Sequence, residues 1–298
     1  MIRTSVSSRT GNSSPRRRAV TTLSIRTLGN TEVLIDGQPA DWHAQTAREL
    51  FLFLLSNPEG VSKNEILERL WGLEPTPSAS NRFRVTVHRV RTALDRHDAI
   101  REEFGRYRVS SEVLCATDIH RWYTTLERAN HATDPTERLS LYQRALGMYH
   151  GDYLPGENAD WVNGVREEHK AAYVRAALEV SLLHCDHGSC ESAVGALVRA
   201  LRADPYIGEN YHQKLMTCLS VVEGKYASIE HYRRFIHFLR EELSDAPMDE
   251  TRDLAERIKG GESICVRHLG PDVPLTLNCP LTPDGSCPGV FGVLIKLA

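Results

Sequence analysis

The sequence predicts a mainly α-helical fold with a small β component, in which a short mixed region precedes a long helical one. From Leu23 to Ile35, apolar and polar residues alternate on either side of Gly29-Asn30, and Asp36-Gly37 follows, a pattern typical of antiparallel strands joined by tight turns. Between Asp118 and about Lys259, apolar residues recur at helical spacing, and Gly and Pro fall mainly at junctions. These two observations set the order of the expected elements.

Length and composition favour a soluble globular protein of two ordinary domains, since the chain has 298 residues, of which 41% are hydrophobic and 25% charged. A net charge of −3 gives no general attraction to nucleic acid, so DNA binding would require a local basic patch. The seven cysteines include no Cys-x-x-Cys pair, which argues against a disulfide framework or a common zinc site. No apolar run is long enough for a membrane span and no signal peptide is recognisable, so we expect a cytoplasmic protein.

Four segments are expected along the chain. Residues 1–22 are predicted to be a disordered basic tail, residues 23–112 a first domain, residues 116–259 a helical domain, and residues 260–298 a tail of unknown structure. The basic tail would either add non-specific attraction to phosphate or act as a solvated leader without a fixed partner.

The first two helices of the first domain are each predicted from a capping pattern. Thr46 and Glu49 have the spacing of a capping box, so Thr46 is expected to begin the first helix. Ser62 and Glu65 repeat that spacing for a second helix, which ends at Gly72. A stiff loop with two prolines, residues 74–77, then leads to a third helix.

The third helix is predicted to present two different faces. Its apolar stripe contains Phe83, Val87, Val90 and Leu94, which share one side at about 100° per residue. A helix with an apolar back and an arginine-rich front fits the DNA major groove, although arginine is also common on ordinary surface helices. The side opposite the apolar stripe collects Asn81, Arg82, Val85, His88, Arg89, Thr92 and Arg96, with Arg84 and Arg91 on the flank.

After this helix, residues 100–109 have the pattern of a hairpin that turns at Gly105. The meander, three helices and hairpin resemble a winged helix-turn-helix of OmpR/PhoB type. The segments 46–51, 61–71, 85–94 and 105–109 look like that family's first, second and recognition helices and its wing, which implies a sequence-specific DNA-binding domain. The residues we expect at the DNA are Thr46, Arg48, Trp71, Asn81, Arg82, Arg84, Val85, Thr86, His88, Arg89, Arg91, Thr92, Arg96 and Arg106.

Two of these expectations carry an open alternative. Trp71 would either offer its indole N–H to a phosphate or have a purely structural role. The wing departs from the family pattern because Glu102 and Glu103 stand where a basic or neutral segment would favour phosphate, so contacts from the wing are expected from Arg106 alone.

The helical region is similar to a tetratricopeptide-repeat array, because Ala193, Leu197 and Pro205 have the spacing of such a repeat. Together with the winged helix and the segment Leu141–Pro155, this order resembles the Streptomyces antibiotic regulatory protein (SARP) family, in which a bacterial transcriptional activator domain follows the DNA-binding domain. The resemblance implies an activator of a secondary-metabolite gene cluster. Its implied partners are promoter direct repeats, RNA polymerase holoenzyme, and a second protomer in a homodimer or side by side on the DNA.

Within that resemblance, Leu73 and Glu74 in the loop before the third helix are expected to contact the polymerase. A fragment ending near Glu112 is expected to keep DNA binding, at reduced affinity because paired protomers are lost.

No enzyme is predicted, since the sequence contains neither a Gly-x-Ser-x-Gly elbow nor a phosphate-binding Gly-x-x-x-x-Gly-Lys loop. His184-Cys-Asp-His187 with Cys190 has ligand types suited to zinc, but its place at a helix end favours a structural reading, so no metal or cofactor is expected. The alternative function is a helical protein-interaction adaptor whose winged helix serves association. The operator, the pathway, any ligand of the helical domain and the oligomeric state off DNA stay open.

Overall fold

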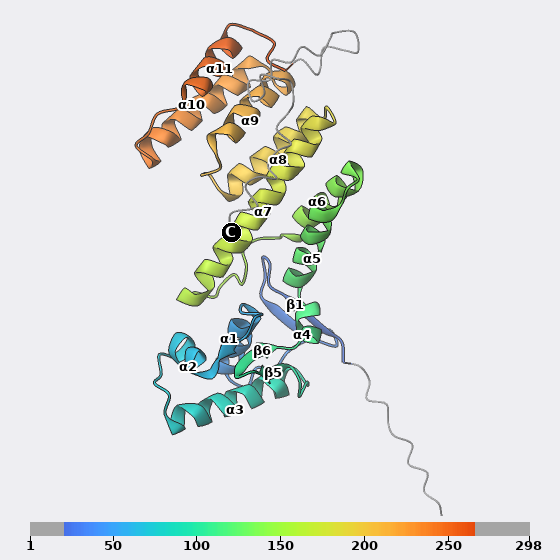
Figure 1. The fold of residues 1–298 in the computed structure, drawn as a ribbon, viewed down its shortest axis with the longest axis vertical. Coiled ribbons are helices and arrows are strands. Elements are labelled where there is room, and N and C mark those ends of the chain that lie inside the picture. The colour runs from blue at the N-terminus through green and yellow to red at the C-terminus, as the bar shows by residue number, and fades with distance from the viewer. Residues whose placement is uncertain (1–20, 266–298) are drawn as a thin grey trace, which may run out of the picture.

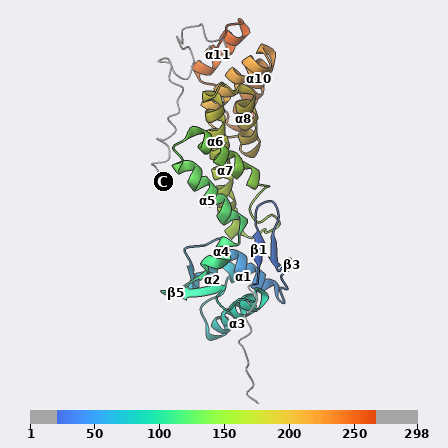
Figure 2. The same ribbon diagram turned by 90° about the vertical axis from the view of Figure 1, so that its right-hand side faces the viewer.

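The computed structural model describes residues 21–265 of the chain. These residues form an elongated molecule with the winged-helix region at one end and stacked helices leading to the other (Figures 1 and 2). The predicted fold class is confirmed. The predicted basic tail, apart from its last two residues, and most of the predicted C-terminal tail lie outside the described residues.

Two small sheets and three helices make up the winged-helix region. The first sheet has the strand order β1-β2-β3 and is antiparallel, with Ile25 opposite Val33. The second sheet has the order β4-β6-β5, in which β5 and β6 form the predicted hairpin. The elements in chain order are β1 (Leu23–Arg26), β2 (Glu32–Ile35), β3 (Gln38–Pro39), α1 (Gln45–Leu55), β4 (Val61–Ser62), α2 (Lys63–Trp71), α3 (Pro77–Ala93), β5 (Ile100–Glu103) and β6 (Arg106–Val109).

The capping box predicted for α2 is confirmed. The Ser62 hydroxyl accepts the Glu65 N–H at 3.3 Å, and the Glu65 carboxylate accepts the Ser62 N–H at 2.9 Å, so two backbone donors at the start of the helix are satisfied. The hydrogen bond with the Ser62 side chain is the main cause of a lowered Glu65 pKa. Gly72 ends the helix in the left-handed region, at φ 59°.

The capping box predicted for α1 is wrong. The helix begins at Gln45 with Ala44 as its N-cap and no side-chain cap, so Thr46 lies inside the first turn. Packing sets this start instead: Trp42 stacks on Phe51 at 5.4 Å and so fixes the chain just before the helix. The free energy of burial therefore outweighs the local capping preference here.

The remaining described chain is helical, and successive helices pack against each other in pairs, as in a tetratricopeptide-like array. Helix α7 is the longest of the described helices and runs without a break from Asp160 to Asp186. The helices are α4 (Ser111–Cys115), α5 (Asp118–His131), α6 (Pro135–Met148), α7 (Asp160–Asp186), α8 (Cys190–Ala203), α9 (Glu209–Val222), α10 (Lys225–Glu242) and α11 (Asp249–Lys259).

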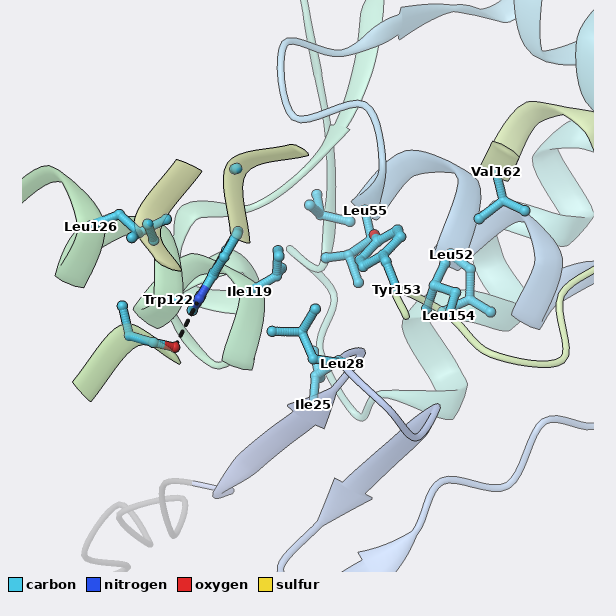
Figure 3. Close-up of a cluster of buried hydrophobic side chains, with 14 of the residues drawn as sticks. Ile25, Leu28, Leu52, Leu55, Ile119, Trp122, Leu126, Tyr153, Leu154 and Val162 are labelled. Atoms are coloured by element: carbon cyan, nitrogen blue, oxygen red, sulfur yellow. Dashed lines mark hydrogen bonds between the residues drawn. The ribbon is translucent and has the colours of Figure 1, made fainter. Parts of the chain in front are cut away.

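One apolar core continues from the winged-helix region into the helical region. Leu28 lies beside Ile119 of α5, and Leu52 of α1 lies beside Leu154 and Val162 (Figure 3). All five side chains are buried. The two regions are therefore packed together at their junction, and the boundary expected between residues 112 and 116 is no flexible linker.

Polar contacts reinforce this junction, and the residues directly after β1 supply most of them. The Asp118 carboxylate accepts the Thr27 N–H at 2.8 and 2.9 Å, the Thr27 hydroxyl at 2.6 Å and the Leu28 N–H at 3.1 Å. In return the Leu154 N–H donates to the Thr27 carbonyl at 2.7 Å. Gly29 passes so close to the segment after α6 that an added Cβ would lie 2.7 Å from the His150 carbonyl oxygen, and its φ of 75° also favours glycine.

Candidate nucleic-acid interface

Helix α3 is held against the winged-helix core by the predicted apolar stripe. Thr76 caps the helix by accepting the Ala79 N–H at 3.2 Å, and Pro77 occupies its first turn. Phe83, Val87 and Val90 are buried, as is Leu94 at the C-cap. The two-faced helix predicted from the sequence is therefore confirmed in its buried half.

Aromatic contacts fix the helix relative to the wing. The Phe83 ring lies 4.7 Å from the Tyr107 ring of β6 and 6.5 Å from the Trp71 ring. The Tyr107 hydroxyl donates to Glu102 at 2.7 Å. Burial, and then this carboxylate, raise the pKa of Tyr107 to about 12, so the phenol stays neutral and keeps its hydrogen bond.

The outer face of α3 is exposed and basic. Among residues 21–265, none of the arginines at positions 82, 84 and 89 forms an ion pair with an acid, so their charges face solvent uncompensated by a close partner. Val85 adds an exposed apolar spot between them. The exposed residues of this face, called the α3 face below, are Asn81, Arg82, Arg84, Val85, His88, Arg89 and Thr92.

Three predicted DNA residues of α3 and its end do not belong to the α3 face. The Arg91 guanidinium donates to the Ile100 carbonyl at 2.7 Å, and the Arg96 guanidinium donates to the Thr21 carbonyl at 3.0 Å. Thr86 is buried and its hydroxyl donates to the Arg82 carbonyl at 2.8 Å. Arg91 thus ties α3 to β5, Arg96 ties its C-terminal end to the segment before β1, and Thr86 packs inside.

Two predicted DNA residues outside α3 also have side chains that make contacts within the protein. Arg48 forms a salt bridge with Glu157 of the helical region, and both side chains are largely covered. The indole Nε1 of Trp71 is buried and has no hydrogen-bond partner among the described residues, so it does not face a phosphate. The ring instead supports the Arg82 guanidinium, which lies 5.1 Å above it, and this favours the structural alternative for Trp71.

Both acids of the wing have partners within the protein. Glu102 accepts the Tyr107 hydroxyl, and Glu103 pairs with Arg108. Arg106 donates to the Gly60 carbonyl at 3.1 and 2.6 Å from its Nε and a terminal nitrogen, so its guanidinium is only partly available. Arg108 therefore offsets the charge of Glu103, whereas Glu102 keeps its charge beside a neutral phenol.

Phe104 at the tip of the wing was not anticipated from the sequence. It is fully exposed, and it adopts a φ of 52° next to Gly105 at 76°, in a tight turn between β5 and β6. An exposed aromatic ring on a hairpin tip stabilises nothing by burial, and apolar wedges of this kind can insert between DNA bases. The sequence feature that could have identified Phe104 is an aromatic residue at the turn of the predicted hairpin.

The loop before α3 has one accessible and one packed residue. Glu74 is exposed. Leu73 is half-buried against the core, and its N–H donates to the Leu67 carbonyl at 2.9 Å. Of the two residues expected to meet the polymerase, Glu74 is the one whose side chain is open to a partner.

The histidine and cysteine segment at the C-terminal end of α7 contacts neighbouring groups of the protein. His187 contacts the Leu183 carbonyl through Nδ1 at 2.6 Å, and His184 contacts Gln143 across the helices at 3.1 Å. Among the residues that the structure describes, no group of three or more potential ligands is arranged to hold a metal ion. In the same range no helix is long and apolar enough to cross a bilayer.

The structure thus combines a winged helix that has an exposed basic face on α3 with a helical array packed onto it, and comparisons with known proteins relate this arrangement to transcriptional regulators. Residues 117–259 match the family model described as bacterial transcriptional activator domain. The chain is 26% identical over 255 residues to regulatory protein AfsR of Streptomyces griseus, and 26% identical over 240 residues to that of Streptomyces coelicolor. These matches cover 84% and 78% of this chain but about a quarter of each relative, 25% and 23%.

The fold also has a solved counterpart in Mycobacterium tuberculosis EmbR, determined in complex with a low-affinity phosphopeptide. The TM-score is 0.67 at 20% identity, covering 81% of this chain and 66% of that one, so this likeness concerns the fold. Together these findings bear out the resemblance to regulators of SARP type: residues 117–259 match the bacterial transcriptional activator domain, and most of the chain is similar to two AfsR regulatory proteins.

Proposed function

We propose that the protein binds promoter DNA through the α3 face and activates transcription by recruiting RNA polymerase. The observation that carries the proposal is the set of unpaired arginines at positions 82, 84 and 89 on a helix whose opposite side is fully anchored. Each phosphate neutralised by such a cation releases counterions, which makes DNA binding strongly salt-dependent. A bacterial protein that acts on promoter DNA has to be in the cytoplasm, so this location is part of the proposal.

Base reading is assigned to the centre of the α3 face. Arg82 and Arg89 are two helical turns apart and lie on the same side of α3. From there each guanidinium can donate two hydrogen bonds to a guanine edge or to a phosphate. Arg82 is held in place by the Trp71 ring, which lowers the entropy lost on binding. Arg84 and the wing residues Arg106 and Phe104 are assigned to the flanking backbone and minor groove.

Removing both central arginines is expected to abolish specific binding, at a cost of about 1–3 kcal/mol for each. The substrate is DNA selected by the wild-type protein from a random library, and fluorescence anisotropy over a range of salt concentrations gives affinity and salt slope. Arg82→Ala with Arg89→Ala is compared with Arg240→Ala, an exposed arginine on α10. Circular dichroism checks folding, and Arg89→Ala alone leaves the contact with Trp71 intact.

Unchanged affinity of the folded double variant would refute the α3 face as the DNA site. That result would favour the second candidate function, a protein-interaction adaptor, for which the paired helices α5 to α10 offer the surface.

For activation, we propose that Glu74 and the helical region contact the polymerase, while protomers lie side by side on direct repeats as a homodimer or adjacent copies. The Streptomyces source of the relatives supports a secondary-metabolite gene cluster as the target.

Glu74→Ala is expected to leave promoter occupancy intact and to lower transcript yield in a purified transcription assay. The exposed side chain makes no hydrogen bond or ion pair in the described chain, so its loss should not disturb the fold. Leu73→Ala would also reduce stability, because that side chain packs on the core, so its effect on transcription would not report on a polymerase contact alone. Glu59→Ala, which removes another exposed glutamate of the winged-helix region, before α2, is the matched control. Equal loss of occupancy and transcript, or loss of neither, would count against the loop.

A further inference from the structure

A cavity of about 580 Å³ lies at the junction, between β1 and the helix pair α5/α6. Leu28 and Met148 give it an apolar part. Its volume falls within the range of about 300–1,000 Å³ that is usual for small-molecule sites. The polar side chains that line it are Arg26, Asp118, His120, Arg121, Thr124, Thr125, Arg128, Arg144 and His150.

The cavity carries a strong positive charge. Arg121, Arg128 and Arg144 are exposed, and within residues 21–265 their guanidinium groups form no ion pair or hydrogen bond. Arg121 and Arg128 are seven residues apart on α5, which places them two turns apart on one side of the helix, while Arg144 faces them from α6. Arg26, by contrast, is paired with Glu32 at 3.3 Å.

The one acid in the lining does not offset these charges for a ligand. The Asp118 carboxylate is already bound by the Thr27 N–H and hydroxyl and by the Leu28 N–H. The lining hydroxyls are also in use, since Thr124 donates to the His120 carbonyl and Thr125 to the Arg121 carbonyl. The three arginines are thus free donors in the lining, and they are donors suited to phosphate.

We propose that this cavity binds a small phosphorylated molecule of nucleoside diphosphate size. The three guanidinium groups would hold the phosphates, and Leu28 with Met148 would contact an apolar or aromatic body. DNA is the less suitable occupant: α3 lies at the far end of the winged-helix region in both views, whereas α5 and α6 rise on the other side of β1 (Figures 1 and 2).

Because β1 and α5/α6 belong to different regions, a bound ligand bridges them. A ligand that binds the folded state alone raises its stability. Occupancy is therefore expected to raise the melting temperature of the whole chain and to resist separation of the two regions.

The test uses isothermal titration of the full chain with ADP, pyrophosphate and adenosine, together with thermal melts. ADP and pyrophosphate should bind and raise the melting temperature, and uncharged adenosine should do neither. Arg121→Ala with Arg128→Ala should weaken ADP binding at least about tenfold, because each substitution removes a charge-assisted hydrogen bond to phosphate. Arg240→Ala on α10 should leave it unchanged. Arg144→Ala, on the other helix, serves as a second variant if the double variant does not fold.

Failure of both ADP and pyrophosphate to bind the wild type would overturn the proposal, as would equal binding by the variants. A third result also overturns it: no binding of small anions, combined with weaker promoter affinity and a smaller salt slope for the Arg121 and Arg128 variants, would show a DNA backbone contact. None of these outcomes depends on the α3 face, which the Arg82 and Arg89 variants test separately.

Discussion

A fragment that ends near Glu112 is expected to lose cooperative folding rather than to retain DNA binding at reduced affinity. Such a fragment uncovers Leu28 and Leu52, along with the ring of Phe53, which meets Trp161 at 5.5 Å. Each large apolar side chain moved from the core to water costs about 1.5–3 kcal/mol. A domain has only about 5–15 kcal/mol of stability in total, so the structure argues against the expectation drawn from the sequence.

Urea unfolding followed by circular dichroism checks this, with residues 21–112 compared with residues 21–265. A third fragment, residues 21–187, keeps α5, α6 and α7 against the winged-helix region and is expected to unfold cooperatively. Asp118→Asn in the full chain gives a graded version, because it replaces a charged acceptor of the Thr27 and Leu28 N–H groups. A 21–112 fragment with the same transition midpoint as the longer chain would show that the shared core is dispensable.

Mild acid is expected to destabilise the far end of the helical array through two buried histidines. His212 and His231 lie in contact, with Nδ1 of the first 3.2 Å from Nε2 of the second, and both are buried. Burial, and for His212 also the neighbouring imidazole, lower their pKa values to about 3 and about 4.

The sign follows from proton uptake. Both imidazoles are neutral in the folded and unfolded chain above a pH of about 6.5, so folding releases no proton from them there and stability does not depend on their titration. Below that pH the unfolded chain takes up protons first, and stability falls until the folded pKa values are reached. At about pH 5 the loss is about 2 kcal/mol for each histidine.

Urea midpoints measured at neutral pH and at about pH 5 test this dependence. His212→Gln with His231→Gln should reduce the difference between the two midpoints, whereas His237→Gln, an exposed residue of α10, should not. Some dependence should persist, because burial also lowers the pKa of His169 to about 4. An equally large difference in the double variant would exclude this pair as the source.

Local features were predictable from the sequence because their partners lie close along the chain. The Ser62 and Glu65 capping box spans one helical turn, and the stripe of Phe83, Val87 and Val90 repeats within α3. Both follow from spacing alone. The start of α1 did not follow, since packing of Trp42 on Phe51 decides it.

The parts of the candidate site that were missed depend on distant partners. Arg48 meets Glu157, 109 positions away, and Arg96 meets Thr21, 75 positions away, so helical periodicity could not separate them from the free arginines. Thr86 lies at the edge of the buried stripe, where periodicity gives no sharp limit. The assignment of Arg82, Arg84 and Arg89 to DNA stays a prediction.

The packed junction at β1 has a geometric consequence for promoters. Since Thr27 and Leu28 are bonded to Asp118 and the core is continuous, α3 and the activator domain share one orientation. Under the proposed function, the turn of the DNA at which α3 docks therefore decides on which side of the duplex the activator domain stands. DNA completes a turn in about 10–10.5 base pairs, so tolerance to altered spacing must come from twisting or bending of the promoter rather than from a hinge in the protein.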